Sequence, residues 1–204
     1  MARPSISDLQ TLLTEAVIPF YRIERSTPLR FAPGRHENDA EHSWSLALFA
    51  CALASYVNPK MDVGKIAQFA IVHDLVEVHA GDTSNFAAES ERATKDEREQ
   101  IAFQRLQSDL AAFPWLLESI ESYERQTSEE ARFVKSIDKM LTLLIDYTEE
   151  GEFYKENHIT IEQWRQKLQK QRAKASKHPG AFQYYDELWE LLLANPHFFH
   201  QPKK

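Results

Sequence analysis

The imidazole of His73 and three carboxylates fall within ten consecutive residues of this sequence. His73 and Asp74 are adjacent, Glu77 follows His73 by four residues, and Asp82 comes directly after Gly81. Residues four apart lie on the same face of a helix, so His73 and Glu77 are expected to point the same way. The apolar residues before His73 predict a mostly buried helix, where an ionised aspartate is unfavourable unless it is paired or metal-bound. The combination indicates a metal-dependent hydrolysis site.

A protein metal site usually has three or four protein ligands, so further ligands are needed. His42 stands at the expected start of another helix, in Ala40-Glu41-His42-Ser43-Trp44. Asp138 lies among apolar residues at helical spacing, which gives it the same solvation problem as Asp74. One metal site with nitrogen ligands from His42 and His73 and oxygen ligands from Asp74 and Asp138 would explain why both aspartates stand among apolar residues. The alternatives are an ion pair between Asp138 and a neighbouring lysine, and a neutral core histidine beside surface acids.

Helices must position these residues, because no segment alternates between apolar and polar residues over a useful length. Capping residues, Pro and Gly mark the expected boundaries. Ser5 or Ser7, Asp39 and Asp62 are the expected caps of the first three helices, and Gly81 is the expected end of the third. We predict an all-α fold of seven or eight helices, with loops at 24–38 and 82–93 and helices at about 5–22, 39–57, 63–80, 94–112, 115–125, 128–151, 159–174 and 181–194.

The composition excludes several classes of protein. The chain has 204 residues, 43% of them hydrophobic, and a net charge of −7, which argues against a partner that is a nucleic acid polymer or an anionic membrane. Its longest apolar run, Leu46–Ala54, is too short to span a bilayer.

The N-terminus lacks a signal-peptide pattern, so we expect a cytoplasmic protein. Cys51, the one cysteine, excludes a disulfide framework and is expected to be buried. Five histidines are expected to be solvated: His36, His158, His178, His197 and His200.

Three motifs in order resemble the HD superfamily of metal-dependent phosphohydrolases. They are Arg35-x-Glu37-Asn38-x-x-Glu41-His42-Ser43, His73-Asp74-x-x-Glu77-x-x-x-Gly81-Asp82 and Asp138-Lys139. They are most similar to the branch that contains bacterial 5′-deoxynucleotidases and their eukaryotic HD-domain relatives. The resemblance covers roughly residues 10–150 and implies a helical core of about five helices. We therefore expect one domain over residues 1–204, with a C-terminal helical extension from about residue 151.

The resemblance also implies a role for each candidate residue. One divalent ion would be held by His42, His73, Asp74 and Asp138. Imidazole and carboxylate ligands together suit Mn, Co, Fe or Zn better than Mg. The acids that orient water or pass protons would be Glu77 and Asp82. The residues near the substrate phosphate would be Arg25, Arg30 and Arg35.

A small phosphorylated substrate, most closely a (deoxy)nucleoside 5′-monophosphate, is the substrate that the resemblance implies. It also implies a homodimer. Within the superfamily, dinuclear enzymes carry additional histidines before the final aspartate, whereas here only His79 lies in that interval. Alarmone hydrolases have a Glu-Asp pair after the HD helix, whereas here Val78 follows Glu77. A non-catalytic binding or signalling module with a structural metal is the alternative from another class, although such a module would not need Glu77 or Asp82.

Overall fold

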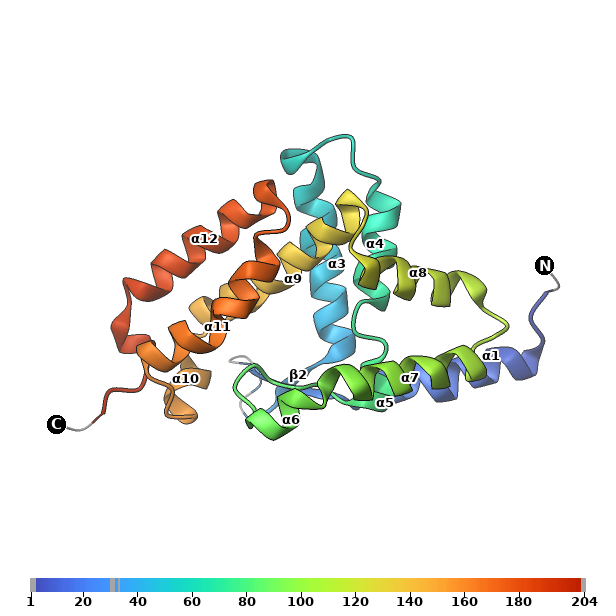
Figure 1. Ribbon diagram of the computed structural model, residues 1–204, viewed down its shortest axis with the longest axis horizontal. Helices are drawn as coiled ribbons and strands as arrows, with labels where there is room; N and C mark the ends of the chain where they lie inside the picture. Colours follow the sequence, from blue (N-terminus) through green and yellow to red (C-terminus); the bar gives the residue numbers. More distant parts are fainter. Residues whose placement is uncertain (1–2, 30–31, 33, 203–204) are drawn as a thin grey trace.

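The computed structural model describes residues 3–29, 32 and 34–202, and within these ranges it is helical apart from one two-stranded hairpin (Figure 1). The all-α prediction is therefore confirmed. The N-terminal helix forms as three consecutive pieces, α1 (Ile6–Leu12), the π-helical turn η1 (Leu13–Val17) and α2 (Ile18–Phe20). Ser5 caps α1 in a reciprocal pair of hydrogen bonds with Asp8, as one of the two predicted caps.

Three helices form the centre of the molecule: α3 (Asp39–Val57), α4 (Val63–Val72) and α9 (Glu129–Thr148). Asp62 caps α4 as predicted. The cap of α3 is Asn38 rather than Asp39, because the Asn38 side chain accepts from the backbone of the third helical residue. This shift makes Asp39 the first residue of the helix and leaves its side chain free to face inward.

The helix predicted over residues 63–80 is interrupted, and this expectation was wrong. α4 ends at Val72, a turn follows, and the short helix α5 (Glu77–Ala80) then ends at Gly81, which has the positive φ expected of a C-terminal glycine. The reason lies at His73, whose Nδ1 lies 2.9 Å from the Ala70 carbonyl oxygen, an acceptor that the continuing helix would use. Glu77 consequently begins a new helix instead of lying one turn along the same face.

Two strands form within residues 24–38, where a loop was predicted. β1 (Glu24–Pro28) pairs antiparallel with β2 (His36–Asn38), in a register that places Glu24 opposite Asn38 and Pro28 opposite His36. The strands are short and their register is irregular, so they lack the alternation that predicts a strand. The hairpin leads directly into α3 and carries Arg25 and Glu37 toward the start of that helix.

Three helices cover one side of the centre: α6 (Glu89–Ala93), α7 (Lys95–Asp109) and α8 (Pro114–Arg125). The last two agree closely with prediction, whereas α6 lies inside the segment expected to be irregular. A hydrophobic cluster joins this side to the N-terminal helix and to the turn after α4. It contains Ala16, Phe20, Val72, Leu75, Val76, Ala80, Ala102, Leu106, Leu110, Leu116 and Ile120. The turn that contains His73 and Asp74 is thus fixed in position by its own apolar residues, which pack into this cluster.

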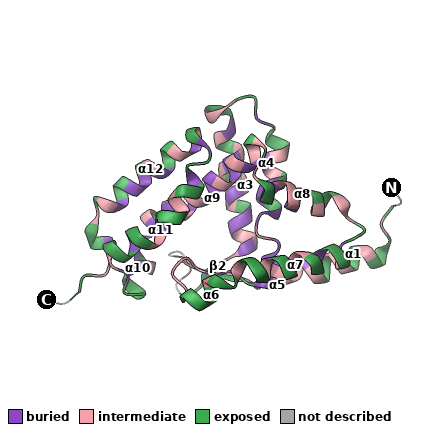
Figure 2. Ribbon diagram, viewed as in Figure 1, coloured by how far each residue is buried: buried purple, intermediate pink, exposed green. Residues whose placement is uncertain are grey.

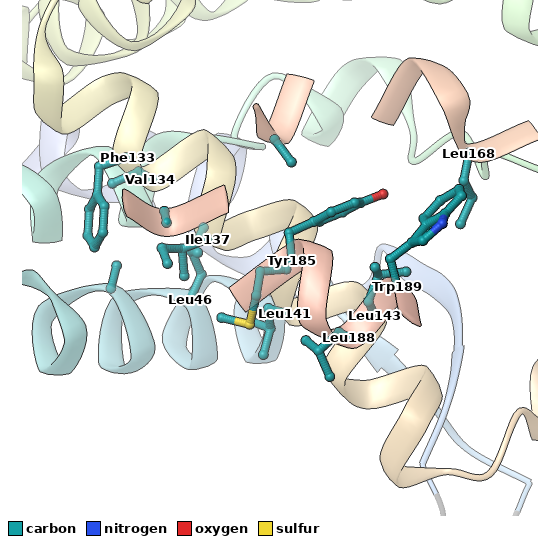
Figure 3. Close-up of a cluster of buried hydrophobic side chains, with 14 of the residues drawn as sticks. Leu46, Phe133, Val134, Ile137, Leu141, Leu143, Leu168, Tyr185, Leu188 and Trp189 are labelled. Carbon is teal, nitrogen blue, oxygen red and sulfur yellow. The ribbon is translucent and has the colours of Figure 1, made fainter. Parts of the chain in front are cut away.

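The C-terminal residues pack against the other side of α9. They form α10 (Glu152–Glu156), α11 (Ile161–Ala175), α12 (Pro179–Leu193) and the 3-10 turn η2 (Pro196–Phe198). Figure 3 shows side chains of α11 and α12 meeting those of α9 in one hydrophobic cluster, which also includes Leu46 of α3. Each large apolar side chain buried there contributes about 1.5–3 kcal/mol. The cluster fixes α11 beside α9, and Figure 2 shows buried positions along α3 and α9.

Two single-residue expectations differ from the structure. Cys51 is half-buried, packed against the large cluster, rather than fully buried. His178 is buried instead of solvated, because its ring packs against Phe133 and its Nδ1 accepts from the Ala181 backbone at the start of α12. In the part of the chain that the structure describes, none of the helices combines the length and apolarity needed to cross a membrane.

Candidate metal centre

Two histidines and an aspartate from separate parts of the chain meet at the centre of the molecule. His42 comes from the first turn of α3, His73 from the end of α4, and Asp138 from the middle of α9. Their donor atoms lie within 4.8 Å of one another, and His42 Nε2 is 3.3 Å from Asp138 Oδ1. All three are at most 3% exposed. Two buried imidazoles beside a buried carboxylate form a mixed donor set that could hold a divalent metal ion.

Asp74, the fourth predicted ligand, connects this cluster to a second group of carboxylates. Its Oδ2 lies 2.9 Å from His73 Nε2. Its carboxylate also lies within 4.8 Å of those of Asp39 and Glu77. The structure therefore brings the four predicted ligands together, with Asp74 at the edge of the histidine cluster.

The far nitrogen of each histidine has a partner that orients its ring. His73 Nδ1 contacts the Ala70 carbonyl, and His42 Nδ1 lies 3.2 Å from Glu37 Oε2. Partners of this kind place the proton on Nδ1 and leave Nε2 available to a cation. Glu37 is 4% exposed and comes from β2. Sequence reasoning assigned it no role, although it stands in the first motif, five residues before His42.

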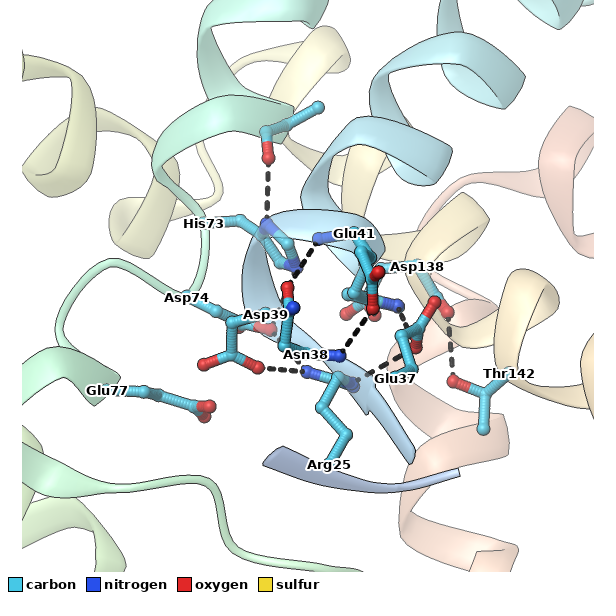
Figure 4. A network of polar contacts seen from close by, with 12 residues as sticks. Arg25, Glu37, Asn38, Asp39, Glu41, His73, Asp74, Glu77, Asp138 and Thr142 are labelled. Atoms are coloured by element: carbon cyan, nitrogen blue, oxygen red, sulfur yellow. Dashed lines mark hydrogen bonds and ion pairs between the residues drawn. The ribbon is translucent and has the colours of Figure 1, made fainter. Parts of the chain in front are cut away.

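Arg25 fills the space beside the acids, and Figure 4 shows its guanidinium between Asp74 and Glu37. Its Nη1 lies 3.0 Å from Asp74 Oδ2 and 3.1 Å from Asp39 Oδ1, and its Nε lies 3.5 Å from Glu37 Oε2. The side chain is 14% exposed. A single guanidinium therefore faces three carboxylates, which is fewer positive charges than negative ones.

The titration of the neighbouring acids reflects this excess of negative charge. Burial and repulsion from Asp74 raise the pKa of Glu77 to about 10, even though Lys95 Nζ lies 3.2 Å away. The same two causes raise the pKa of Asp39 to about 6. A bound cation would relieve such repulsion. The donor set and the charge together fit a divalent ion held by the two histidines and the adjoining aspartates.

The cluster borders a cleft of about 530 Å³. His73, Asp74, Glu77 and Asp82 line it, as does Arg25. Of the other two predicted phosphate contacts, the structure describes only Arg35. Arg35 is exposed on the hairpin and pairs with Glu41 at 2.8 Å, and it does not line the cleft. Arg30 lies outside the described residues.

The opposite wall of the cleft is basic, which sequence reasoning missed. Lys135 and Lys139 come from α9, and the others come from α11 and the turn after it. The six lysines that line this wall are Lys135, Lys139, Lys167, Lys170, Lys174 and Lys177. Lys167, Lys170 and Lys174 are spaced by three and four residues, so they occupy one face of α11, and Lys177 lies in the turn that follows. That spacing is visible in the sequence and could have indicated a basic helix face.

Comparison with known proteins points in the same direction as the geometry. Residues 21–178 match the family described as HD domain. A crystal structure described as a predicted metal-dependent phosphohydrolase from Magnetospirillum magnetotacticum MS-1 has a TM-score of 0.76 and 29% identity, with 96% of each chain covered. A conserved hypothetical protein from Pyrococcus furiosus shares the fold, with a TM-score of 0.58 and 22% identity over 93% of this chain and 99% of that one.

Two curated relatives match a shorter segment. The 5′-deoxynucleotidase HDDC2 of Homo sapiens is 29% identical over 113 residues, which is 54% of this chain and 53% of that protein. Its counterpart in Mus musculus is 30% identical over 111 residues, which is 53% of each chain. The chain thus spans about half the length of the curated relatives it matches.

Proposed function

The chain belongs to the HD domain family, and from this we propose that it is a metal-dependent phosphohydrolase that releases phosphate from (deoxy)nucleoside 5′-monophosphates. The observation that carries the proposal is the buried cluster of His42, His73 and Asp138, with Asp74 beside it at the border of a cleft. The named activity of the curated relatives supports the choice of nucleotide.

One divalent ion would be held by His42, His73, Asp74 and Asp138. When bound, it would lower the pKa of a water molecule and neutralise charge on the phosphoryl group. The donor set of nitrogen and oxygen atoms favours Mn, Co, Fe or Zn over Mg. The contacts at Nδ1 of both histidines keep the rings in place before any ion arrives.

Arg25 is the basic residue best placed to bind the scissile phosphate. It lines the cleft and already contacts Asp74, a predicted ligand, through Nη1. A guanidinium presents several donors in one plane, which suits phosphate oxygens. The Arg25 guanidinium pairs with three carboxylates. A bound divalent ion would neutralise part of their negative charge, and the guanidinium would then interact more strongly with a substrate phosphate.

Glu77 and Asp82 are the proposed proton-handling acids. Both line the cleft, and neither belongs to the histidine cluster. Glu77 is held by Lys95, so its carboxylate has a fixed position beside Asp74. An acid so placed can take a proton from an attacking water or give one to the leaving oxygen, which typically contributes 10²–10⁴-fold to the rate.

Phosphate release from purified protein tests the proposal. The protein is stripped of metal, reloaded with Mn, Co, Mg or Zn, and given nucleoside 5′-monophosphates, with 3′-monophosphates as the comparison. Glu77→Gln and Asp82→Asn should each lower the rate by about 10²-fold or more at equal metal occupancy. Glu187→Gln, an exposed change on α12, is the matched control and should leave the rate unchanged.

Equal rates for the wild type and both acid variants would remove Glu77 and Asp82 from the mechanism. Absence of release with every metal and nucleotide would instead favour a non-catalytic module whose metal is structural.

A further inference from the structure

The two walls of the cleft differ in charge. The segment that follows α4 contributes Asp74, Glu77 and Asp82. The wall formed by α9, α11 and the turn after α11 contributes six lysines, here called the lysine wall: Lys135, Lys139, Lys167, Lys170, Lys174 and Lys177. The one acid on that wall, Asp146, is buried and accepts a hydrogen bond from the Tyr154 hydroxyl. The lysine wall is therefore strongly basic in a protein whose net charge is −7.

Most of these ammonium groups have no carboxylate partner. Lys139 Nζ lies 2.7 Å from Asp138 Oδ2, and Lys135 lies over the Tyr123 ring. Among the residues that the structure describes, the four lysines of α11 and its following turn form no side-chain ion pair. Charges on an ordinary surface are usually interspersed with charges of the opposite sign. Here like charges are collected on one wall and left uncompensated.

The lysines also lie close enough to repel one another. Desolvation, followed by the charges of Lys139, Lys135 and Lys95, lowers the pKa of the Lys174 ammonium. Three helices therefore direct positive charge at one place, because Lys95 belongs to α7, Lys139 to α9 and Lys174 to α11. Lys139 is paired with Asp138 and Lys95 with Glu77, whereas Lys174 forms no side-chain ion pair among the described residues. An anion from outside the chain would therefore be stabilised beside Lys174.

A nucleoside 5′-monophosphate does not account for this wall. Its single phosphate would be engaged at the metal centre and by Arg25. Lys139 borders that centre through Asp138, whereas the four lysines of α11 and the turn after it form no ion pair with the proposed ligands among the described residues. We propose that the lysine wall binds a second phosphate group of the nucleotide, so that the preferred substrates carry one phosphate besides the one that is hydrolysed. This inference rests on the proposed function for the identity of the scissile group.

Two kinds of nucleotide carry such a group. In adenosine 3′,5′-bisphosphate, water would cleave the P–O bond of the 5′-phosphate, releasing inorganic phosphate and leaving adenosine 3′-phosphate on the lysines. In adenosine 5′-diphosphate, water would cleave the terminal P–O bond, and adenosine 5′-monophosphate would remain. Both steps consume one water and need no other reactant. Assaying the two side by side shows whether the second phosphate lies on the sugar or in the same chain.

The test compares kcat/KM for these two nucleotides with kcat/KM for adenosine 5′-monophosphate, using metal-loaded protein of full length. The wild type should favour at least one of the two-phosphate nucleotides by about tenfold or more, the range of a charge-assisted hydrogen bond. In the double variant Lys170→Gln with Lys174→Gln, that ratio should fall toward one. Both positions are exposed, so the changes leave the core intact.

Arg165→Gln is the matched control, because it removes one positive charge from the opposite, exposed face of α11. It should keep the wild-type ratio. A wild-type ratio near one, or an unchanged ratio in the double lysine variant, would overturn the inference while leaving the proposed function in place.

Calorimetry on the same metal-loaded protein separates the two hypotheses if no nucleotide is turned over. Absence of turnover contradicts the proposed function. The Kd values of nucleotides with one and two phosphates can then be compared directly, because no hydrolysis interferes. Tighter binding of a two-phosphate nucleotide, lost in the double lysine variant and kept in Arg165→Gln, would still support the lysine wall. Equal Kd values for nucleotides with one and two phosphates would overturn it.

Discussion

Asp146 offers a quantitative test of the electrostatics in the wall of the cleft. It is buried on α9, where it accepts from the Tyr154 hydroxyl, which in turn accepts from Trp164 Nε1 at 2.9 Å. Burial raises the pKa of Asp146 from 3.8 to about 7, against the smaller opposing effect of the Tyr154 hydrogen bond. The neutral carboxyl is thus the favoured form inside the protein at moderately acidic pH.

The sign of the stability effect follows from proton binding. Below the unfolded-state pKa of 3.8, both states hold the proton and Asp146 contributes no pH dependence. Between that value and about 7 the unfolded chain has released the proton while the folded protein keeps it, so stability falls as pH rises. Three pKa units at about 1.36 kcal/mol each set the total loss at about 4 kcal/mol once pH passes 7.

Asp146→Asn removes this titration while keeping the shape and the acceptor for Tyr154. Urea unfolding from pH 5 to pH 8 should show the variant gaining on the wild type by about 3 kcal/mol, because about two of the three pKa units lie above pH 5. The other titrating groups are common to both proteins, so their contributions cancel in the difference. Tyr154→Phe is the comparison variant: it removes the hydrogen bond that lowers the pKa of Asp146, so the loss of stability should persist and extend to higher pH.

Stability curves of wild type and Asp146→Asn that stay parallel across this range would refute the reasoning. They would mean that Asp146 has a similar pKa in the folded and unfolded states, and hence that water reaches it from the cleft.

Three further predictions concern the metal centre and the phosphate. Asp74→Ala should lose bound metal, and elemental analysis that found wild-type content would contradict the ligand assignment. Glu37→Ala should weaken metal affinity by about 10–100-fold in a chelator competition, because His42 loses its orienting partner; unchanged affinity would show that Glu37 has no such role. Arg25→Gln should lower kcat/KM by an amount that corresponds to about 1.5–3 kcal/mol of lost transition-state stabilisation, the range of a hydrogen bond to a charged group. Unaltered kinetics would show that Arg25 does not bind the phosphate.

The part of the site built from helix faces could be predicted from the sequence. His73 and Asp138 stand where a helical pattern is otherwise apolar, and His42 stands at an expected helix start. The energetic problem of a buried acid is visible without coordinates. The same local signals gave most helix boundaries, including the Ser5 and Asp62 caps. Such signals depend on residues within one or two turns, which is why they survive in a single sequence.

The contacts that orient the site could not be predicted in this way. Arg25 and Glu37 reach the acids because two short strands pair across a connection whose residues show no strand pattern. The break after Val72 depends on one side chain, His73, contacting the carbonyl three residues before it. Both features arise from single polar contacts, and a periodicity argument averages such contacts away.

The lysine wall illustrates a third case, in which the pattern was visible but its setting was not. The spacing of Lys167, Lys170 and Lys174 places them on one face of a helix, which in isolation indicates only a solvated surface. Their relation to the cleft depends on Trp164 and Leu168, which pack α11 into the large hydrophobic cluster beside α9. The apolar residues of α11 thus decide where its charges lie, so the C-terminal extension contributes to the site through packing that local sequence patterns do not reveal.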